Sequence, residues 1–335
     1  MTETFVFAAN AILPIVILII LGYFLKRIKF IDIHFINILN KYVFRVGLPV
    51  LLFYNVYNLE NFNDINWGVI LFAVSAMLIM FTICYFTIFF TVKDPNQKGV
   101  ILQVVVRSNF ALIGIPLAQS IGGIEALAVV ALLSAFTIPL ANVLSVIALT
   151  MYQVNEFGQK ISVKKMIRNI LTNPLIIGVM AGLMVVFLRG IITPSGGEPI
   201  FTIKNNLFFA YDSIRLISVT ASPMALIALG GHFELSVVKP LIKKIILGVS
   251  WRIIIVPSVV LTAAYLLQDK IVGMEYSYAG LIALFASPVA VSSAIMVHEM
   301  GGDEKLAGQL VVWSSVFSIF TMFAVIVIFR TLGAL

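Results

Sequence analysis

Two segments of this sequence, one in each half of the chain, decide the predicted fold. Residues 108–128 read SNFALIGIPLAQSIGGIEALA, and residues 287–307 read SPVAVSSAIMVHEMGGDEKLA. Without gaps, seven of the 21 aligned positions are identical, including a shared Gly-Gly pair. A segment that recurs at a fixed separation indicates two copies of one structural unit.

Two shorter matches keep the same order along the chain. The Gly-Leu-Pro at 47–49 has a counterpart in the Ala-Ser-Pro at 221–223, and the proline and glycine at 14 and 22 are spaced like those at 174 and 182. Chance similarity between apolar, glycine-rich helices explains any single match. Their common order favours a repeat, with a first copy over 1–155 and a second over 156–335.

The composition places the chain in a membrane. Hydrophobic residues make up 61% and charged residues only 11%, and the mean hydropathy is +1.09, whereas soluble proteins carry about a quarter charged residues. Continuous apolar runs of roughly 20 residues are typical of transmembrane helices and not of barrel strands. We therefore predict an all-α polytopic membrane protein of ten transmembrane helices, near residues 8–25, 42–58, 66–91, 99–120, 124–150, 170–188, 205–231, 245–267, 278–298 and 307–329.

Lysine and arginine placement predicts the orientation. The loops after the odd-numbered spans hold 14 of the 22 basic residues, the loops on the other side and the C-terminal end hold four, and four lie within spans. Because basic loops stay in the cytoplasm, both termini are predicted outside a plasma (inner) membrane. Topology thus accounts for the net charge of +7 without a nucleic-acid partner. The first apolar run lacks a basic leader and is interpreted as a retained helix.

An odd number of spans per copy makes the second copy enter the membrane from the opposite side. Inverted repeats are common in secondary transporters, where the binding site lies near the midplane between the copies. Pro288 removes a backbone donor in mid-span, and the matching segment includes Asn109. Two broken helices, the fourth and the ninth, are therefore predicted to cross, and half-helix N-termini at such breaks favour an anion.

Arg107 is the most informative charge in the sequence. It lies in mid-span at an estimated depth of ~12 Å, where a buried arginine marks a pathway and binds carboxylates with its planar fork. Snorkelling to the surface or a structural ion pair are the alternatives. The predicted substrate-binding residues are Arg107, Ser108, Asn109, Ser287, Pro288 and Val289, and the predicted helix-break or hinge residues are Gly114, Pro116, Pro49 and Pro223. A packing kink is the alternative for each break.

Other chemistry finds little support in the sequence. His298-Glu299 begins like a zinc-protease motif, but position 302 is glycine instead of the second histidine. The single cysteine, Cys84, excludes an intramolecular disulfide. Asp212 and Arg215 are spaced as a local ion pair on one helix. We predict no metal, no cofactor and no enzymatic activity.

At these residues the chain resembles the auxin efflux carrier family, in its bacterial malate-permease-like branch. The resemblance covers nearly the whole chain and rests on NKYVFRVGLPVLLF (40–53), RSNFALIGIPL (107–117), NPLIIGVMAG (173–182), SPMALIALG (222–230) and the segment 287–303. It implies ten helices in two inverted sets of five, with Asn109 and Pro288 marking the crossing. Spans 1, 2, 6 and 7 would form a scaffold that mediates a homodimer, and spans 3–5 and 8–10 a transport domain that moves like an elevator.

The resemblance also implies a substrate class, auxin in plants and malate or similar carboxylates in bacteria. Ser108 stands where plant members have proline, and only about twenty residues separate spans 5 and 6 in place of a long loop, so a smaller anion than auxin is expected. The leading hypothesis is a secondary carrier of a mono- or dicarboxylate. The rivals are a cation–proton antiporter of related architecture, which requires a buried titrating carboxylate, and a non-transporting membrane sensor or chaperone.

Overall fold

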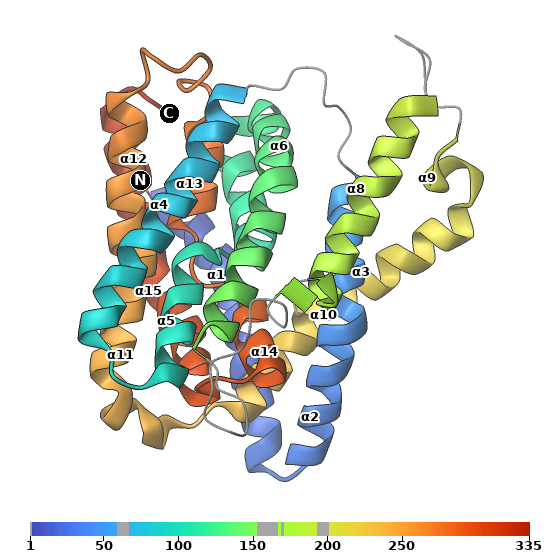
Figure 1. Cartoon of the computed structure of the whole chain (residues 1–335), viewed down its shortest axis with the longest axis vertical. Coiled ribbons are helices and arrows are strands. Elements are labelled where there is room, and N and C mark those ends of the chain that lie inside the picture. Colours follow the sequence, from blue (N-terminus) through green and yellow to red (C-terminus); the bar gives the residue numbers. More distant parts are fainter. Residues whose placement is uncertain (1, 59–66, 153–166, 169–170, 193–200) are drawn as a thin grey trace.

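The computed structural model describes residues 2–58, 67–152, 167–168, 171–192 and 201–335. Every regular element within these residues is helical (Figure 1). The α-helices are α1 (Thr2–Arg27), α2 (Ile33–Tyr42), α3 (Leu48–Tyr57), α4 (Trp67–Thr91), α5 (Pro95–Val106), α6 (Ile115–Thr150), α8 (Pro174–Ile192), α9 (Ile203–Asn206), α10 (Phe208–His232), α11 (Val238–Ser250), α12 (Val256–Leu266), α13 (Tyr278–Ala286), α14 (Val291–Met300) and α15 (Glu304–Thr331). Three π-helical turns, η1 (Val43–Gly47), η2 (Phe110–Gly114) and η4 (Trp251–Ile255), and one 3-10 turn, η3 (Leu235–Val237), join some of them.

Seven helical segments of the described chain are long and apolar enough to cross a membrane. They cover 33–57, 67–91, 132–150, 174–192, 208–232, 238–266 and 304–331, and each coincides with one predicted span. The prediction of a polytopic all-α membrane protein is therefore confirmed at this level. The three other predicted spans fall on α1 and on two interrupted helices, α5–η2–α6 and α13–α14.

Short polar and glycine signals determine where the helices near the site begin and bend. The side chain of Asp94 accepts a hydrogen bond from the backbone N–H of Asn96 at 2.9 Å, and Asp303 accepts one from Leu306 at 2.9 Å, which caps α5 and α15. Gly123 has φ 66° and ψ −156° and separates two helical parts of α6. This backbone conformation suits glycine, and it returns the chain toward the side from which α5 entered.

Two helix pairs with close backbone approach form one side of the molecule. The most extensive contacts among the described helices are those of α1 with α10 and of α3 with α8. Glycines permit both approaches, because a Cβ on Gly22 would meet the backbone of Ile227 and a Cβ on Gly178 would meet the backbone of Pro49. Small residues allow such close packing in membranes, where hydrophobic burial does not drive helix association.

The close approach of α1 and α10 makes a strong test of this packing. Substituting Gly230 by alanine places a Cβ against the carbonyl of Ile19, and overpacking of this kind costs about 1–3 kcal/mol. We expect Gly230→Ala to lower the thermal unfolding midpoint of the purified protein. Gly190→Ala is the matched control, because a Cβ there has nothing within 4 Å and alanine favours the helix. Equal midpoints for the two variants would contradict the packing.

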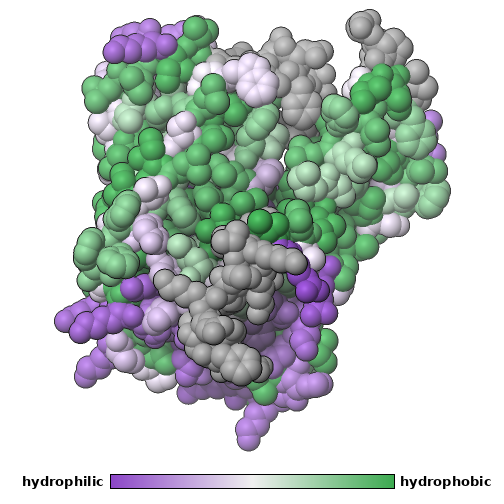
Figure 2. All heavy atoms as spheres, viewed as in Figure 1, coloured by the Kyte–Doolittle hydropathy of each residue, from purple (hydrophilic) through white to green (hydrophobic). Residues whose placement is uncertain are grey.

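The surface has an apolar zone and a hydrophilic end. Large apolar side chains are exposed on several helices, for example Phe90 on α4 and Phe187 on α8, as expected for helices that face lipid. Figure 2 shows a broad hydrophobic zone above a hydrophilic lower edge. This lower edge is where α2 and α11 begin and where α14 passes into α15 (Figure 1).

Candidate functional site

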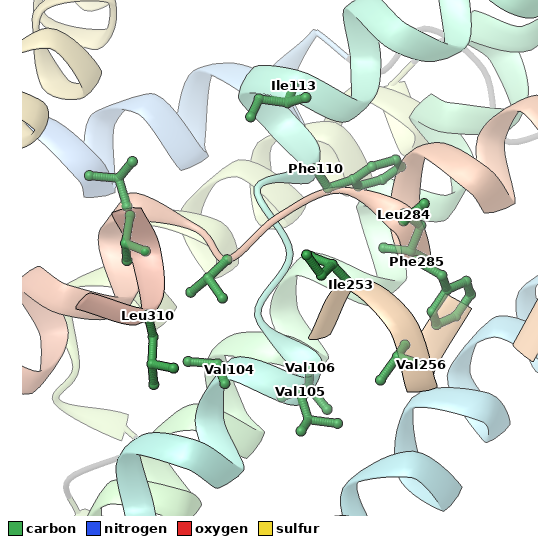
Figure 3. Close-up of a cluster of buried hydrophobic side chains, with 14 of the residues drawn as sticks. Val104, Val105, Val106, Phe110, Ile113, Ile253, Val256, Leu284, Phe285 and Leu310 are labelled. Atoms are coloured by element: carbon green, nitrogen blue, oxygen red, sulfur yellow. The ribbon is translucent and has the colours of Figure 1, made fainter. Parts of the chain in front are cut away.

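The two interrupted helices meet at their breaks. The extended segment between α5 and η2 pairs with the extended segment between α13 and α14 in a single antiparallel bridge, Ser108 with Val289. The N–H of Asn109 donates to the carbonyl of Pro288 at 2.8 Å, and the N–H of Ala290 donates to the carbonyl of Arg107 at 3.0 Å. Figure 3 shows the two thin segments crossing among buried hydrophobic side chains. The bridge thus satisfies backbone groups that the helix breaks would leave unpaired.

Arg252 on η4 satisfies the carbonyls at the ends of the half-helices. Its side chain is 1% exposed. Its guanidinium donates to the carbonyls of Ser287 at 2.9 Å, Val105 at 2.9 Å, Leu284 at 2.8 Å and Phe285 at 3.1 Å. Arg252 therefore joins the C-terminal ends of α5 and α13, and its donors are used within the protein.

A cavity opens on the crossing between the two groups of helices. It has a volume of about 80 Å³, well below the roughly 300–1,000 Å³ of pockets for drug-sized ligands. The described residues that line it are Leu48, Leu51, Leu52, Arg107, Ser108, Asn109, Phe110, Ile138, Ala141, Asn142, Leu175, Ser222, Ala225, Ala290, Val291 and Ser292. None of these lining residues is acidic, so the only formal charge on the wall is that of Arg107.

The guanidinium of Arg107 is held in place by two polar side chains from other helices. It donates to Asn142 Oδ1 at 2.7 Å and to Ser292 Oγ at 3.0 Å. The amide of Asn142 is itself oriented by a hydrogen bond from its Nδ2 to the carbonyl of Ile138 at 2.9 Å. Arg107 is 5% exposed and has no acidic partner among the described residues. This rules out the structural ion pair and the snorkelling alternatives for the described surroundings.

Three polar groups of residues that line this wall have no hydrogen-bond partner among the described residues. They are Nε of Arg107, Nδ2 of Asn109 and Oγ of Ser108, and all three are buried. Buried donors without partners are rare and costly. All three belong to residues that line one cavity, so unused hydrogen-bonding capacity is concentrated at this wall.

The first turn of α14 adds partial positive charge to the same wall. Its N-cap residue, Ala290, offers no side-chain hydrogen bond, and Val291 and Ser292 both line the cavity. The first N–H groups of a helix are unpaired within it and carry the positive end of the helix dipole. Together with Arg107, they make an environment that favours a small anion.

The structure brings together some of the predicted site residues and not others. Arg107, Ser108 and Asn109 line the cavity. The residues 287–289 lie at the bridge, but the second segment contributes residues 290–292 to the cavity wall instead. The hydroxyl of Ser287 is engaged, because it donates to the carbonyl of Ala283 at 2.6 Å.

Two of the predicted hinge residues, Pro49 and Pro223, are sequence neighbours of residues that line the cavity. Pro49 stands in the first turn of α3 beside Leu48, and Pro223 lies inside α10 beside Ser222. Gly114 ends η2 and packs near the carbonyl of Ala283. Residue 116 lies in the first turn of α6, and its side chain is outside the described part of the chain.

Asn142 and Ser292 were missed by sequence reasoning. Each is a polar residue within a predicted membrane span, which is the signal that could have identified them. Their pairing with Arg107 depends on three helices that are distant in sequence, so spacing alone does not reveal it.

The structure also describes two other charged groups considered in the sequence, the pair of Asp212 and Arg215 and the surroundings of His298. The local pair of Asp212 and Arg215 is confirmed, with 2.7 Å between Arg215 Nη2 and Asp212 Oδ1 on an accessible face of α10. His298 lies near Glu299 and Glu304. No group of three or more potential metal-ligating side chains is found within the described residues.

An all-helical chain with seven candidate spans and a polar cavity at paired helix breaks defines a polytopic membrane protein of the transporter class. A family model described as membrane transport protein matches residues 7–326. The chain belongs to this family, the auxin efflux carrier family whose sequence pattern it resembles. No curated protein matches the chain. Family membership indicates a transporter rather than an enzyme.

Proposed function

We propose that this protein is a secondary transporter that carries a small organic anion, a malate-like mono- or dicarboxylate, across the plasma membrane. The observation that carries the proposal is the cavity wall, where a buried arginine has an unpartnered Nε beside the unpartnered donors of Ser108 and Asn109. A carboxylate presents two acceptor oxygens that match such a set of donors. The small cavity volume favours a substrate of few heavy atoms over a bulky aromatic acid.

We propose further that ten helices form two inverted repeats of five. Equivalent segments of a twofold arrangement contact each other on the axis, and two such contacts support this. Asn109 and Pro288 are aligned in the repeat and hydrogen-bond to one another. Gly47 and Ala221 are also aligned, and a Cβ on Gly47 would lie 3.1 Å from that of Ala221. The pairings of α1 with α10 and of α3 with α8 exchange under the same alignment.

An elevator-like movement is the mechanism we propose for alternating access. The cavity lies between helices α3, α8 and α10 on one side and the crossing, α6 and α14 on the other. Movement of the crossing with α4–α6 and α11–α15 relative to α1–α3, α8 and α10 would carry a bound anion along the boundary. We propose that α1–α3, α8 and α10 form the scaffold of a homodimer. We also propose that the hydrophilic lower edge faces the cytoplasm, with both termini outside.

A cation–proton antiporter is the second candidate, and the described residues favour it less. That mechanism requires a carboxylate that titrates within the membrane. The acidic residues described at the ends of the crossing helices are Asp94 at the start of α5 and Glu299, Asp303 and Glu304 at the junction of α14 and α15. None of them lines the cavity at the crossing.

A binding screen tests the proposed substrate class. We expect acetate-to-malate-sized carboxylates to raise the thermal unfolding midpoint of the purified protein, because a ligand at 100 times its Kd adds about 2.7 kcal/mol of stability. Uncharged amides of the same acids are the matched controls, since they keep the size and lose the charge. An indole carboxylate is expected to have a smaller effect. Uptake of the best ligand into liposomes completes the test, and no carboxylate uptake under any ion or voltage gradient would overturn the proposal.

A further inference from the structure

The boundary that holds the cavity continues along α10 and α14 toward the hydrophilic edge. On α10, Ser222 and Ala225 line the cavity, and His232 follows on the same face, two turns from Ala225. On α14, Ser292 lines the cavity and His298 lies six residues further on. A second, smaller cavity of about 20 Å³ lies at this end of the boundary, and both histidines line it. The histidines therefore stand between the candidate anion site and the hydrophilic edge.

The two imidazole rings contact each other across the boundary. Their centroids are 5.0 Å apart at an interplanar angle of 44°. His298 Nδ1 lies 2.9 Å from Glu304 Oε2, so α14 and α15 hold this ring from their own side. Nε2 of His232 is buried and has no hydrogen-bond partner in the described part of the chain. The ring contact thus joins α10 to α14 with one titratable nitrogen left unsatisfied.

Charged groups from several elements surround the pair. Glu299 of α14 lies 4.0 Å from His298 Nε2, and Lys305 of α15 forms an ion pair with Glu234 at 3.1 Å. Lys26 at the end of α1 is close enough to act electrostatically on His232. His34 and Lys41 of α2 and Arg45 of η1 are exposed. Glu304 contacts His298. Around His232, the acidic groups of Glu304 and Glu234 are opposed by the cationic Lys26 and by the facing ring of His298.

We propose that His232 and His298 form a proton-binding site that controls access from the hydrophilic edge to the anion cavity. His298 lies beside Glu304, and the ring of His232 contacts it. When both rings carry a proton, two cations lie at the ring-contact distance, and like charges repel strongly where water is scarce. Acidification separates α10 from α14, because histidine takes up its proton in this pH range. The inference rests on the proposed function for the identity of the cargo.

Accessibility of the cavity to a thiol reagent tests this gate without any substrate. The chain has one cysteine, Cys84, which is buried, so Cys84→Ala with Ser222→Cys places a single thiol in the cavity wall. A membrane-impermeant thiol reagent is added to the cytoplasmic face of membrane vesicles at about pH 5.5 and about pH 7.5. The labelling rate at the lower pH is divided by that at the higher pH.

The same ratio in a His232→Gln/His298→Gln background cancels the pH dependence of the thiol itself. We expect the ratio to be at least about tenfold larger with both histidines present. His34→Gln is the matched control, because this third histidine is exposed on α2, and it should leave the ratio unchanged. Equal ratios with and without the pair would overturn the inference. If the double variant does not fold, His232→Gln alone provides the comparison.

The outcome is separable from that of the carboxylate screen. pH-dependent labelling without any carboxylate binding would overturn the proposed substrate class and support the gate. Carboxylate uptake together with equal labelling ratios in the presence and absence of the two histidines would support the transporter and overturn the gate.

Discussion

Replacing Arg107 by alanine is expected to reduce carboxylate affinity at least about a hundredfold and to abolish uptake. The guanidinium is the only formal charge among the described residues that line the cavity. Its Nη1 and Nη2 donate to Asn142 and Ser292, which leaves Nε available to donate to a carboxylate. Removal of the side chain takes away both the charge and the fork, and a carboxylate buried without a partner is strongly disfavoured.

Isothermal titration of the purified variant with the best carboxylate of the screen measures this effect. Arg107→Lys keeps the charge but not the planar fork, and we expect an intermediate loss because a point charge binds one oxygen at a time. Arg215→Gln is the control, because Arg215 lies on an accessible face with Asp212. Wild-type affinity in a folded Arg107→Ala protein would refute the proposed site, whereas intact sodium-driven proton exchange in that variant would favour the antiporter.

The sequence was sufficient for the positions of the breaks but not for what completes them. Pro288, the repeat and the apolar runs predicted where the helices stop, because these signals are local. The partners of Arg107 come from α6 and α14, and their convergence follows from three-dimensional packing. Arg252, like Arg107, falls within a predicted span, and its four carbonyl contacts in the structure distinguish it from Arg107.

The two buried arginines therefore have different roles at the crossing. Arg252 satisfies the carbonyls that the broken helices expose, so its charge is neutralised by dipoles within the protein. Arg107 lies at the same crossing with a donor to spare. Arg252 stabilises the broken helices, and Arg107 keeps a donor that can bind a ligand. This difference predicts that the two positions respond to substitution in different ways.

Arg252→Ala is expected to destabilise the fold itself, lowering the thermal unfolding midpoint by about 10 °C or preventing purification of folded protein. The substitution leaves the carbonyls of Val105, Leu284, Phe285 and Ser287 without this donor. Each buried group without a partner costs about 1–3 kcal/mol. The whole is large against the roughly 5–15 kcal/mol that holds a typical fold together. Trp251, buried beside the substituted residue, provides a fluorescence signal for the unfolding measurement.

Arg252→Lys separates stability from binding. An ammonium has three donors on a flexible stem, so it satisfies fewer of the four carbonyls and should recover only part of the lost stability. Carboxylate affinity of the folded lysine variant should stay near that of the wild type, the reverse of the pattern at Arg107. Arg45→Ala, an exposed arginine on η1, controls for loss of positive charge. A melting midpoint for Arg252→Ala equal to that of Arg45→Ala would mean that the crossing does not depend on this arginine, and the division of roles between the two residues would then be wrong.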